Sequence, residues 1–282
     1  MHLSTRFPLS RHSYINGLLK IDTAFRAARQ NAQSMTDRKN LKLELIIVFA
    51  LSLGASAIYS VVSLIAKITA KTGLAGQTTL INGALAEREW LDLTYQLLSV
   101  TLGLAPVALV LYLLWQSTGK PFRSIGLTFD SPGFWLPRGF FLAAAIGIPG
   151  FGLYVFSRLL GWSSKIVPAE LPNYWWAIPI LLLAAVRAAL LEEVLVVAYL
   201  FDRLERLGVS AKIQLLISAV LRASYHLYQG FGGFIGNFAM GLVFGWAYRR
   251  WGRVMPLVLA HFILDAVSFV GYALVGKSLP LP

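Results

Sequence analysis

The stretch Ile178–Leu200, IPILLLAAVRAALLEEVLVVAYL, decides how the chain folds. An α-helix needs roughly 20 apolar residues to cross a bilayer, and this run is long enough. It nevertheless contains two adjacent glutamates, Glu192 and Glu193. An ionised side chain at the centre of a bilayer costs roughly 3 kcal/mol. Such groups are tolerated where they meet in an interior shielded from lipid, so the stretch predicts a helical membrane bundle around a polar site.

The composition of the whole chain also indicates a membrane protein. Of its 282 residues, 57% are hydrophobic, and the mean hydropathy is +0.65, well above the values of soluble domains. We therefore predict an all-α, polytopic transmembrane helical bundle. About seven spans are expected, at 45–66, 93–115, 139–160, 176–200, 213–228, 232–248 and 254–276.

The basic residues set the expected orientation and the expected partners. The net charge is +12, but most lysines and arginines flank apolar spans instead of forming a soluble module. We therefore expect contact with anionic lipid headgroups and no nucleic acid. With a cytoplasmic N-terminus, seventeen Lys and Arg residues fall on the inner side and six on the outer side. This split predicts a multi-pass protein whose C-terminus is external.

We expect three parts along the chain. Residues 1–43 form a basic cytoplasmic tail, in which apolar residues between 14 and 25 recur at helical spacing. The tail is either an interfacial helix or a disordered segment. Residues 44–138 contain the first spans and a hinge loop, and residues 139–282 form a C-terminal bundle. The absence of cysteine excludes disulfides, thiolate metal sites and cysteine nucleophiles.

Five side chains are the candidate site: Glu192, Glu193, His226, His261 and Asp265. His261 and Asp265 are four residues apart, so they share one face of a helix, and the aspartate can orient the imidazole. Successive helical residues point about 100° apart, so the two glutamates cannot have the same role. A carboxylate in such a site can act as a general base on water.

These residues give the chain a resemblance to the CAAX-protease and bacteriocin-processing (CPBP, or ABI) family of intramembrane proteases. The motif EExxxR of that family is matched by Glu192-Glu193, with Val197 in place of its arginine. The motif FxxxH is matched by His226, with Arg222 in place of its phenylalanine. The motif HxxxN, or a variant of it, is matched by His261 and Asp265. The resemblance covers the segment from about 175 to 276, which we take as the CPBP-like core.

The resemblance implies an intramembrane endopeptidase of the glutamate type that cleaves a membrane-associated peptide or protein without a cofactor. Glu192 and His226 would activate the attacking water. His261 and Asp265 would stabilise the oxyanion, although an ionised aspartate repels an oxyanion and would then only orient His261. We expect Arg222 to support the site by pairing with Glu193, which would leave Glu192 free for water.

Three other functions remain open at this stage. A divalent metal, with zinc as the first candidate, could be held by Glu192, His226 and His261 in a metal-dependent version of the same protease. The missing arginine at Val197 favours a catalytically silent membrane partner, or a protein like those of bacteriocin immunity. A small transporter could use the polar cavity as a proton relay.

The predicted orientation can be tested with single cysteines, because the chain has none of its own. A membrane-impermeant maleimide should label Ser278→Cys in intact cells, and Ser10→Cys only after the membrane is opened. The opposite pattern, labelling at position 10 and not at 278, would contradict a cytoplasmic N-terminus.

Overall fold

The structure is a computed structural model that describes residue 33 and residues 35–276. The chain divides into two compact units, residues 1–46 and residues 47–282. In the first unit, the described chain is helical from residue 35 onward. The apolar pattern expected between residues 14 and 25 lies outside the described residues. The candidate site lies entirely in the second unit.

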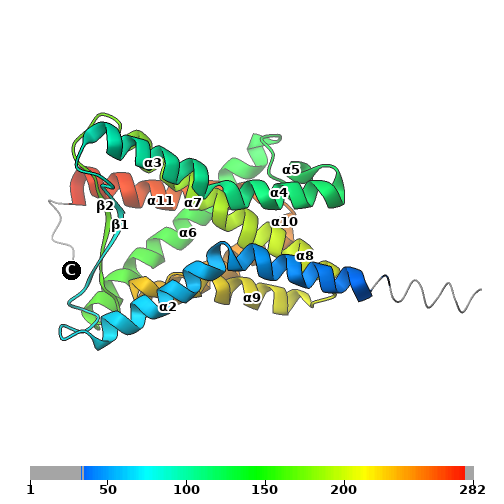
Figure 1. Ribbon diagram of the computed structural model, residues 1–282, viewed down its shortest axis with the longest axis horizontal. Coiled ribbons are helices and arrows are strands. Elements are labelled where there is room, and N and C mark those ends of the chain that lie inside the picture. The colour runs from blue at the N-terminus through cyan, green and yellow to red at the C-terminus, as the bar shows by residue number, and fades with distance from the viewer. Residues whose placement is uncertain (1–32, 34, 277–282) are drawn as a thin grey trace, which may run out of the picture. The chain divides into compact units, whose positions relative to one another are not determined.

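The second unit is mostly helical, as expected (Figure 1). A π-helical segment, η1, joins α7 to α8, and a short 3-10 turn, η2, precedes α10. In chain order the helices are α2 (Leu53–Thr69), α3 (Glu89–Gly103), α4 (Ala105–Thr118), α5 (Pro121–Ser124), α6 (Pro132–Leu159), α7 (Ala177–Glu192), η1 (Glu193–Tyr199), α8 (Leu200–Arg206), α9 (Ala211–Ser224), η2 (Leu227–Gln229), α10 (Phe231–Trp251) and α11 (Met255–Val275).

Several helices are candidate membrane spans. Among the described residues, three are long and apolar enough to cross a bilayer: Glu89–Thr118, Pro132–Leu159 and Met255–Val275. The bent pair Met35–Ala50 and Leu53–Thr69 makes a fourth if it is counted as one span. The other expected spans do not reach this standard. α7 gives way to a π-helix after 16 residues, α9 has only 14, and glycines and Asn237 lower the hydropathy of α10.

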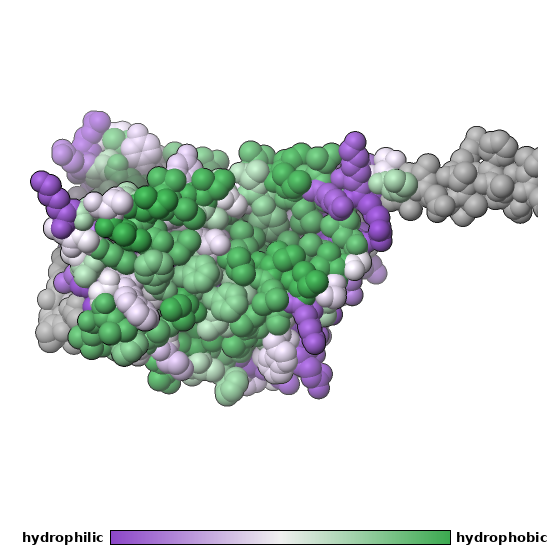
Figure 2. Space-filling model, turned by 90° about the horizontal axis from the view of Figure 1, so that it is seen from below, coloured by the Kyte–Doolittle hydropathy of each residue, from purple (hydrophilic) through white to green (hydrophobic). Residues whose placement is uncertain are grey.

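The outer surface of the unit is apolar, as a bilayer requires. Figure 2 shows hydrophobic residues over most of one face. Large apolar side chains stand out from α6 and from the chain before α7, with Phe141 70%, Ile148 75% and Trp175 82% exposed. A soluble monomer rarely exposes so much contiguous apolar surface. The mostly helical fold with several membrane-spanning candidates therefore agrees with the sequence.

The all-α expectation missed two short strands. β1 (Thr78–Gly83) and β2 (Lys165–Glu170) pair in parallel, with Thr78 opposite Lys165 and Gly83 opposite Glu170 (Figure 1). Both strands lie in connections between long helices. Their sequences, TTLING and KIVPAE, contain only short β-branched stretches, and Pro168 interrupts the second, so the pairing depends on the bundle that brings them together.

The two strands belong to a set of loops that meet at one end of the bundle. Ser163 forms a β-bridge with Gly230 in the loop between α9 and α10. In the same loop, the Tyr225 carbonyl accepts a hydrogen bond from Ser60 Oγ at 2.8 Å, and the Tyr228 carbonyl accepts one from Lys67 Nζ at 2.5 Å. The loop after α9, which carries His226, is therefore fastened by α2 on one side and by the chain before β2 on the other.

A second contact between loops joins the residues after α5 to the start of α11. The amides of Val254 and Met255 donate to the carbonyls of Ile125 (2.9 Å) and Gly126 (3.3 Å). Gly126 has a φ of 65°, and a Cβ there would lie 2.5 Å from the Cα of Arg253. Only glycine fits this turn without strain.

The core contains close helix crossings that small residues allow. A Cβ at Gly241 of α10 would lie 2.7 Å from the Ala219 Cα of α9, and one at Gly245 would lie 2.5 Å from Leu215. The two helices therefore approach closely along these glycines. Val197, at the position where the family motif has arginine, is fully buried in an apolar cluster with residues of α6, α10 and α11.

Candidate functional site

The two glutamates lie where the α-helix becomes a π-helix. α7 ends at Glu192 and η1 begins at Glu193. π-Helical turns are rare and often occur at functional sites, and they are wider than α-helical turns. Glu193 is fully buried, and Glu192 is 9% exposed. The change in helical pitch alters the angle between adjacent side chains, and here both carboxylates reach the same cation.

That cation is Arg222, which extends from α9 and is itself fully buried. Its Nη2 donates to Glu193 Oε1 at 2.7 Å, and its Nη1 donates to Glu192 Oε2 at 3.2 Å. The expected pairing with Glu193 is therefore present. The expectation that Glu192 would be left without this cation was wrong, because a guanidinium has donors enough for two carboxylates.

A residue that the sequence analysis missed completes the environment of Glu192. The hydroxyl of Tyr225 donates to Glu192 Oε2 at 2.8 Å. Both hydrogen bonds that Glu192 accepts from described side chains therefore fall on one carboxylate oxygen, Oε2, and Oε1 keeps its acceptor sites. The only signal in the sequence was that Tyr225 directly precedes His226, where α9 ends.

His226 lies just beyond α9, at the start of η2, and not within a helix as expected. Its Nδ1 is 3.0 Å from the carbonyl oxygen of Arg222. A carbonyl can only accept, so Nδ1 carries the hydrogen, and in the neutral ring Nε2 is free to accept a proton. The ring lies between Tyr225 and Tyr228, with centroids 4.8 and 6.3 Å away.

His261 of α11 is held mainly by Glu193. Its Nδ1 is 2.6 Å from Glu193 Oε1, whereas its Nε2 is 3.6 Å from Asp265 Oδ2. The i, i+4 relation of His261 and Asp265 is present as predicted. The shorter and stronger contact that orients the imidazole, however, comes from Glu193. Nε2 is thus the ring nitrogen that remains available to a third group.

The five candidates and Arg222 therefore form one connected cluster from α7, η1, α9, the loop after α9, and α11. His226 joins it through the Arg222 carbonyl, and within the described residues no hydrogen bond links it to a carboxylate. Glu193 Oε2 and Arg222 Nε are buried and have no hydrogen-bond partner among the described residues. Over that same part of the chain, no group of three or more His, Asp or Glu residues is arranged to hold a metal ion.

Comparison with known proteins agrees with this arrangement. Residues 174–267 match the family described as type II CAAX prenyl endopeptidase Rce1-like. The matched segment, about one third of the chain, contains all five candidates and Arg222. No curated protein and no solved structure matches the chain. Residues 174–267 are therefore a domain of the Rce1-like family, whose members are peptide hydrolases.

The double pairing of Arg222 predicts a large effect on stability. Arg222→Ala would leave two carboxylates without their cation, and Glu193 is fully buried, so we expect a loss of about 3–5 kcal/mol. Thermal unfolding of the purified protein in detergent measures it. Arg206→Ala is the matched control, because its side chain is 40% exposed and such changes usually stay within about 0.5 kcal/mol. Equal stability of the two variants would refute a structural role for the pairing.

Proposed function

We propose that this Rce1-like domain acts as an intramembrane endopeptidase of the glutamate type. The observation that carries the proposal is the meeting of Glu192, Glu193, His226 and His261 around one buried arginine. A general base for water and a donor for an oxyanion are the two elements that peptide hydrolysis needs. The cluster can supply both from side chains alone, without a cofactor.

In this proposal Glu192 and His226 activate the water. Glu192 Oε1 makes no hydrogen bond to another described residue and is free to accept from a water, since both bonds to this side chain fall on Oε2. His226 Nε2 faces no hydrogen-bond partner among the described residues. A water between these atoms can transfer its proton as it attacks the scissile carbonyl. The proton then passes to the leaving amine, as the reverse transfer requires.

His261 is the proposed oxyanion donor. Glu193 accepts the hydrogen bond from Nδ1 and so fixes the ring orientation. In the protonated imidazolium the second N–H, at Nε2, then donates to the developing oxyanion. Asp265 lies 3.6 Å from that nitrogen. A carboxylate at this distance helps to keep the hydrogen on Nε2, but when ionised it cannot donate to an oxyanion. We therefore assign Asp265 to positioning His261.

Glu193 and Arg222 are assigned supporting roles. Arg222 offsets one of the two negative charges of the glutamates and restrains Glu192, and Glu193 links Arg222 to His261. The arginine that the family motif would place at Val197 is thus delivered from α9. This substitution of one cation by another weakens the argument for a silent relative, which rested on the missing arginine.

We further propose seven spans, with a cytoplasmic N-terminus. In that topology the loops at 67–92, 161–175 and 229–231 lie outside, and those at 116–138, 201–212 and 249–253 lie inside. The contacts of β1 with β2 and of Ser163 with Gly230 all join members of the first set. Val254 and Met255, which directly follow the inner loop 249–253, donate to the loop after α5 and so bring two members of the second set together. Alternating loops that gather in these two sets support seven crossings.

The domain division follows the same topology. We assign residues 1–43 to a basic cytoplasmic tail, 44–138 to the first spans and the hinge loop, and 139–282 to the bundle that carries the site.

The proposed substrate is a membrane-associated peptide or protein, because the site lies among helices with apolar outer faces. The basic flanks of the spans favour a membrane with anionic headgroups.

Loss of the water-activating residues should abolish cleavage. Profiling of peptides released from membranes with and without the protein identifies a substrate, and proteoliposomes then give its rate of cleavage. Glu192→Ala and His226→Ala should each lower the rate at least about 100-fold. Glu205→Gln, a change of an exposed acid on α8, should retain the wild-type rate. Wild-type activity in a folded Glu192 or His226 variant would overturn the assignment.

A silent membrane partner and a proton-coupled transporter make different predictions for the same preparation. A silent partner releases no peptide, and its partner co-purifies equally well with wild type and with Glu192→Ala. A transporter acidifies proteoliposomes when its solute is added, and it cleaves nothing. If the protein cleaves no peptide and shows either of these two behaviours, that function replaces the proposed protease.

Metal content decides between the two versions of the protease. The alternative holds zinc between Glu192, His226 and His261, where Glu192 Oε2 and His261 Nδ1 are already bonded to protein groups. We expect elemental analysis of the purified protein to find no stoichiometric metal, and a chelator to leave the cleavage rate unchanged. About one zinc per chain, with activity lost on chelation and restored by zinc, would favour the metal-dependent version.

A further inference from the structure

Lys67 lies near the end of α2, and the site described above does not use it. Its Nζ donates to the Tyr228 carbonyl at 2.5 Å and to the Thr79 hydroxyl. No ion pair within 4.0 Å joins it to another described residue. This half-buried cation is therefore held by neutral groups, one in β1 and one in the loop that carries His226.

The hydrogen bonds beyond Lys67 run in one direction. An ammonium group can only donate, so Thr79 accepts from it and has its own hydrogen left for Ser164, whose Oγ is 2.6 Å away. Ser164 Oγ in turn donates to the Gln229 carbonyl at 3.3 Å. Both hydroxyl residues are buried. Lys67 thus fixes two successive carbonyls of the loop, that of Tyr228 directly and that of Gln229 through the two hydroxyls.

The same face of α2 binds the loop at a second point. Ser60 and Lys67 are seven residues apart, which is about two helical turns, so they share one face of the helix. Ser60 Oγ donates to the Tyr225 carbonyl at 2.8 Å. Carbonyls beyond the end of a helix have no partner within it, and here α2 supplies the donors. His226 lies between the two carbonyls that α2 binds, those of Tyr225 and Tyr228.

Displacement of this loop would move two groups of the proposed site. The loop carries His226, and it carries Tyr225, whose hydroxyl donates to Glu192 Oε2. A misplacement of about 1 Å can lower a catalytic rate about 100-fold. We propose that Lys67 is a positioning residue: by binding the Tyr228 carbonyl, its ammonium group holds His226 in place beside Glu192.

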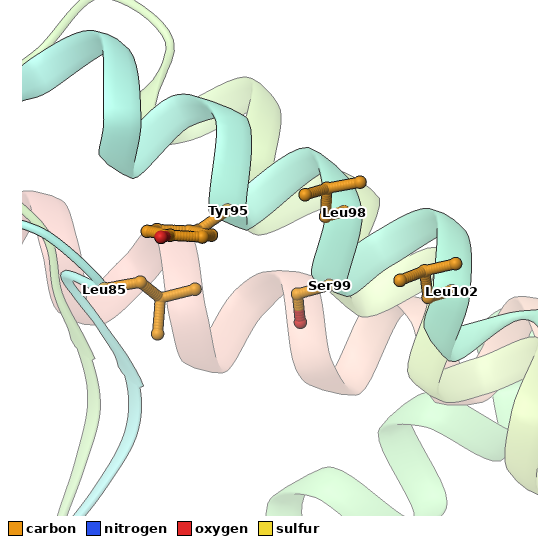
Figure 3. Close-up of a pocket in the computed structure, with 5 residues that line it drawn as sticks. All are labelled: Leu85, Tyr95, Leu98, Ser99 and Leu102. Carbon is orange, nitrogen blue, oxygen red and sulfur yellow. The ribbon is translucent and has the colours of Figure 1, made fainter.

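The inference rests on the proposed function and extends it. Lys67 lies outside residues 174–267, so activity would depend on α2 and β1 as well as on the Rce1-like domain. The network shares no residue with the open cavity beside α3, which is lined by Leu85, Tyr95, Leu98, Ser99 and Leu102 (Figure 3). A change at Lys67 therefore removes no wall of that cavity, and its effect should fall on kcat and not on KM.

The first test separates kcat from KM. The substrate identified by peptide profiling is cleaved in proteoliposomes by wild type, Lys67→Met, Lys67→Arg and the control Lys71→Met, which changes an exposed lysine just beyond α2. Methionine removes the charge and the donors, whereas arginine keeps both. We expect kcat of Lys67→Met to fall at least about tenfold at unchanged KM. Lys67→Arg should restore part of the loss, and Lys71→Met should match wild type.

The second test needs no cleavage. Diethylpyrocarbonate modifies the free nitrogen of an imidazole, and mass spectrometry measures the rate separately for His226 and His261. In Lys67→Met the rate at His226 should rise several-fold because the loop opens more often, while the rate at His261, which Glu193 holds, should stay as in wild type. Thr79→Val, which removes one hydroxyl of the network, should act in the same direction with a smaller effect. Lys71→Met should leave both rates unchanged.

Two results would overturn the inference: wild-type kcat in folded Lys67→Met, or a rate of modification at His226 that is the same in Lys67→Met and in wild type. A lysine with a merely structural role would change the rates at both histidines alike. If Lys67→Met does not fold, Thr79→Val decides by the same comparison. Failure of the proposed function looks different, because then wild type cleaves nothing, and the rate at His226 still decides whether Lys67 positions the loop.

Discussion

The site depends on one interaction, the contact of the Arg222 guanidinium with two adjacent carboxylates. Arg222 is fully buried, and it bonds to Glu193 at 2.7 Å and to Glu192 at 3.2 Å. Charges taken out of water are stable only when paired and hydrogen-bonded. The pairing therefore makes it possible to keep two glutamates side by side in an apolar helix. Because the Arg222 carbonyl also binds His226, one residue sets the positions of both proposed water-activating groups.

The sequence could predict the members of the cluster because charge is costly in an apolar helix. Glu192, Glu193, Arg222 and Asp265 stand out from their surroundings, and the need to pair them predicts that they meet. The contact of Arg222 with Glu193 follows from the same reasoning. The helical content also follows from the pattern of apolar residues. These features depend on residue type and spacing, which a sequence displays directly.

Other features could not be predicted, because they depend on geometry that residue type does not encode. No residue in EVLVVAY marks the change to a π-helix, which begins at Glu193, one of the two glutamates that contact Arg222. Nothing in the sequence distinguishes Tyr225 from other aromatic residues, and its contact with Glu192 depends on where α9 ends. The strand pair requires two loops distant in sequence to lie side by side, and the short β-branched stretch in each loop does not identify its partner.

The strand pair has a consequence for the order of folding. The Thr79 and Ser164 hydroxyls, which lie 2.6 Å apart, belong to residues separated by 85 positions in the chain. Contacts between such distant residues close a long loop and form slowly, after local helices. Ser164 also binds the Gln229 carbonyl, in the loop that carries His226. The loop that carries His226 would then reach its final position only when the preceding helices are inserted and packed, so the proposed water-activating pair of Glu192 and His226 would be completed late in assembly in the membrane.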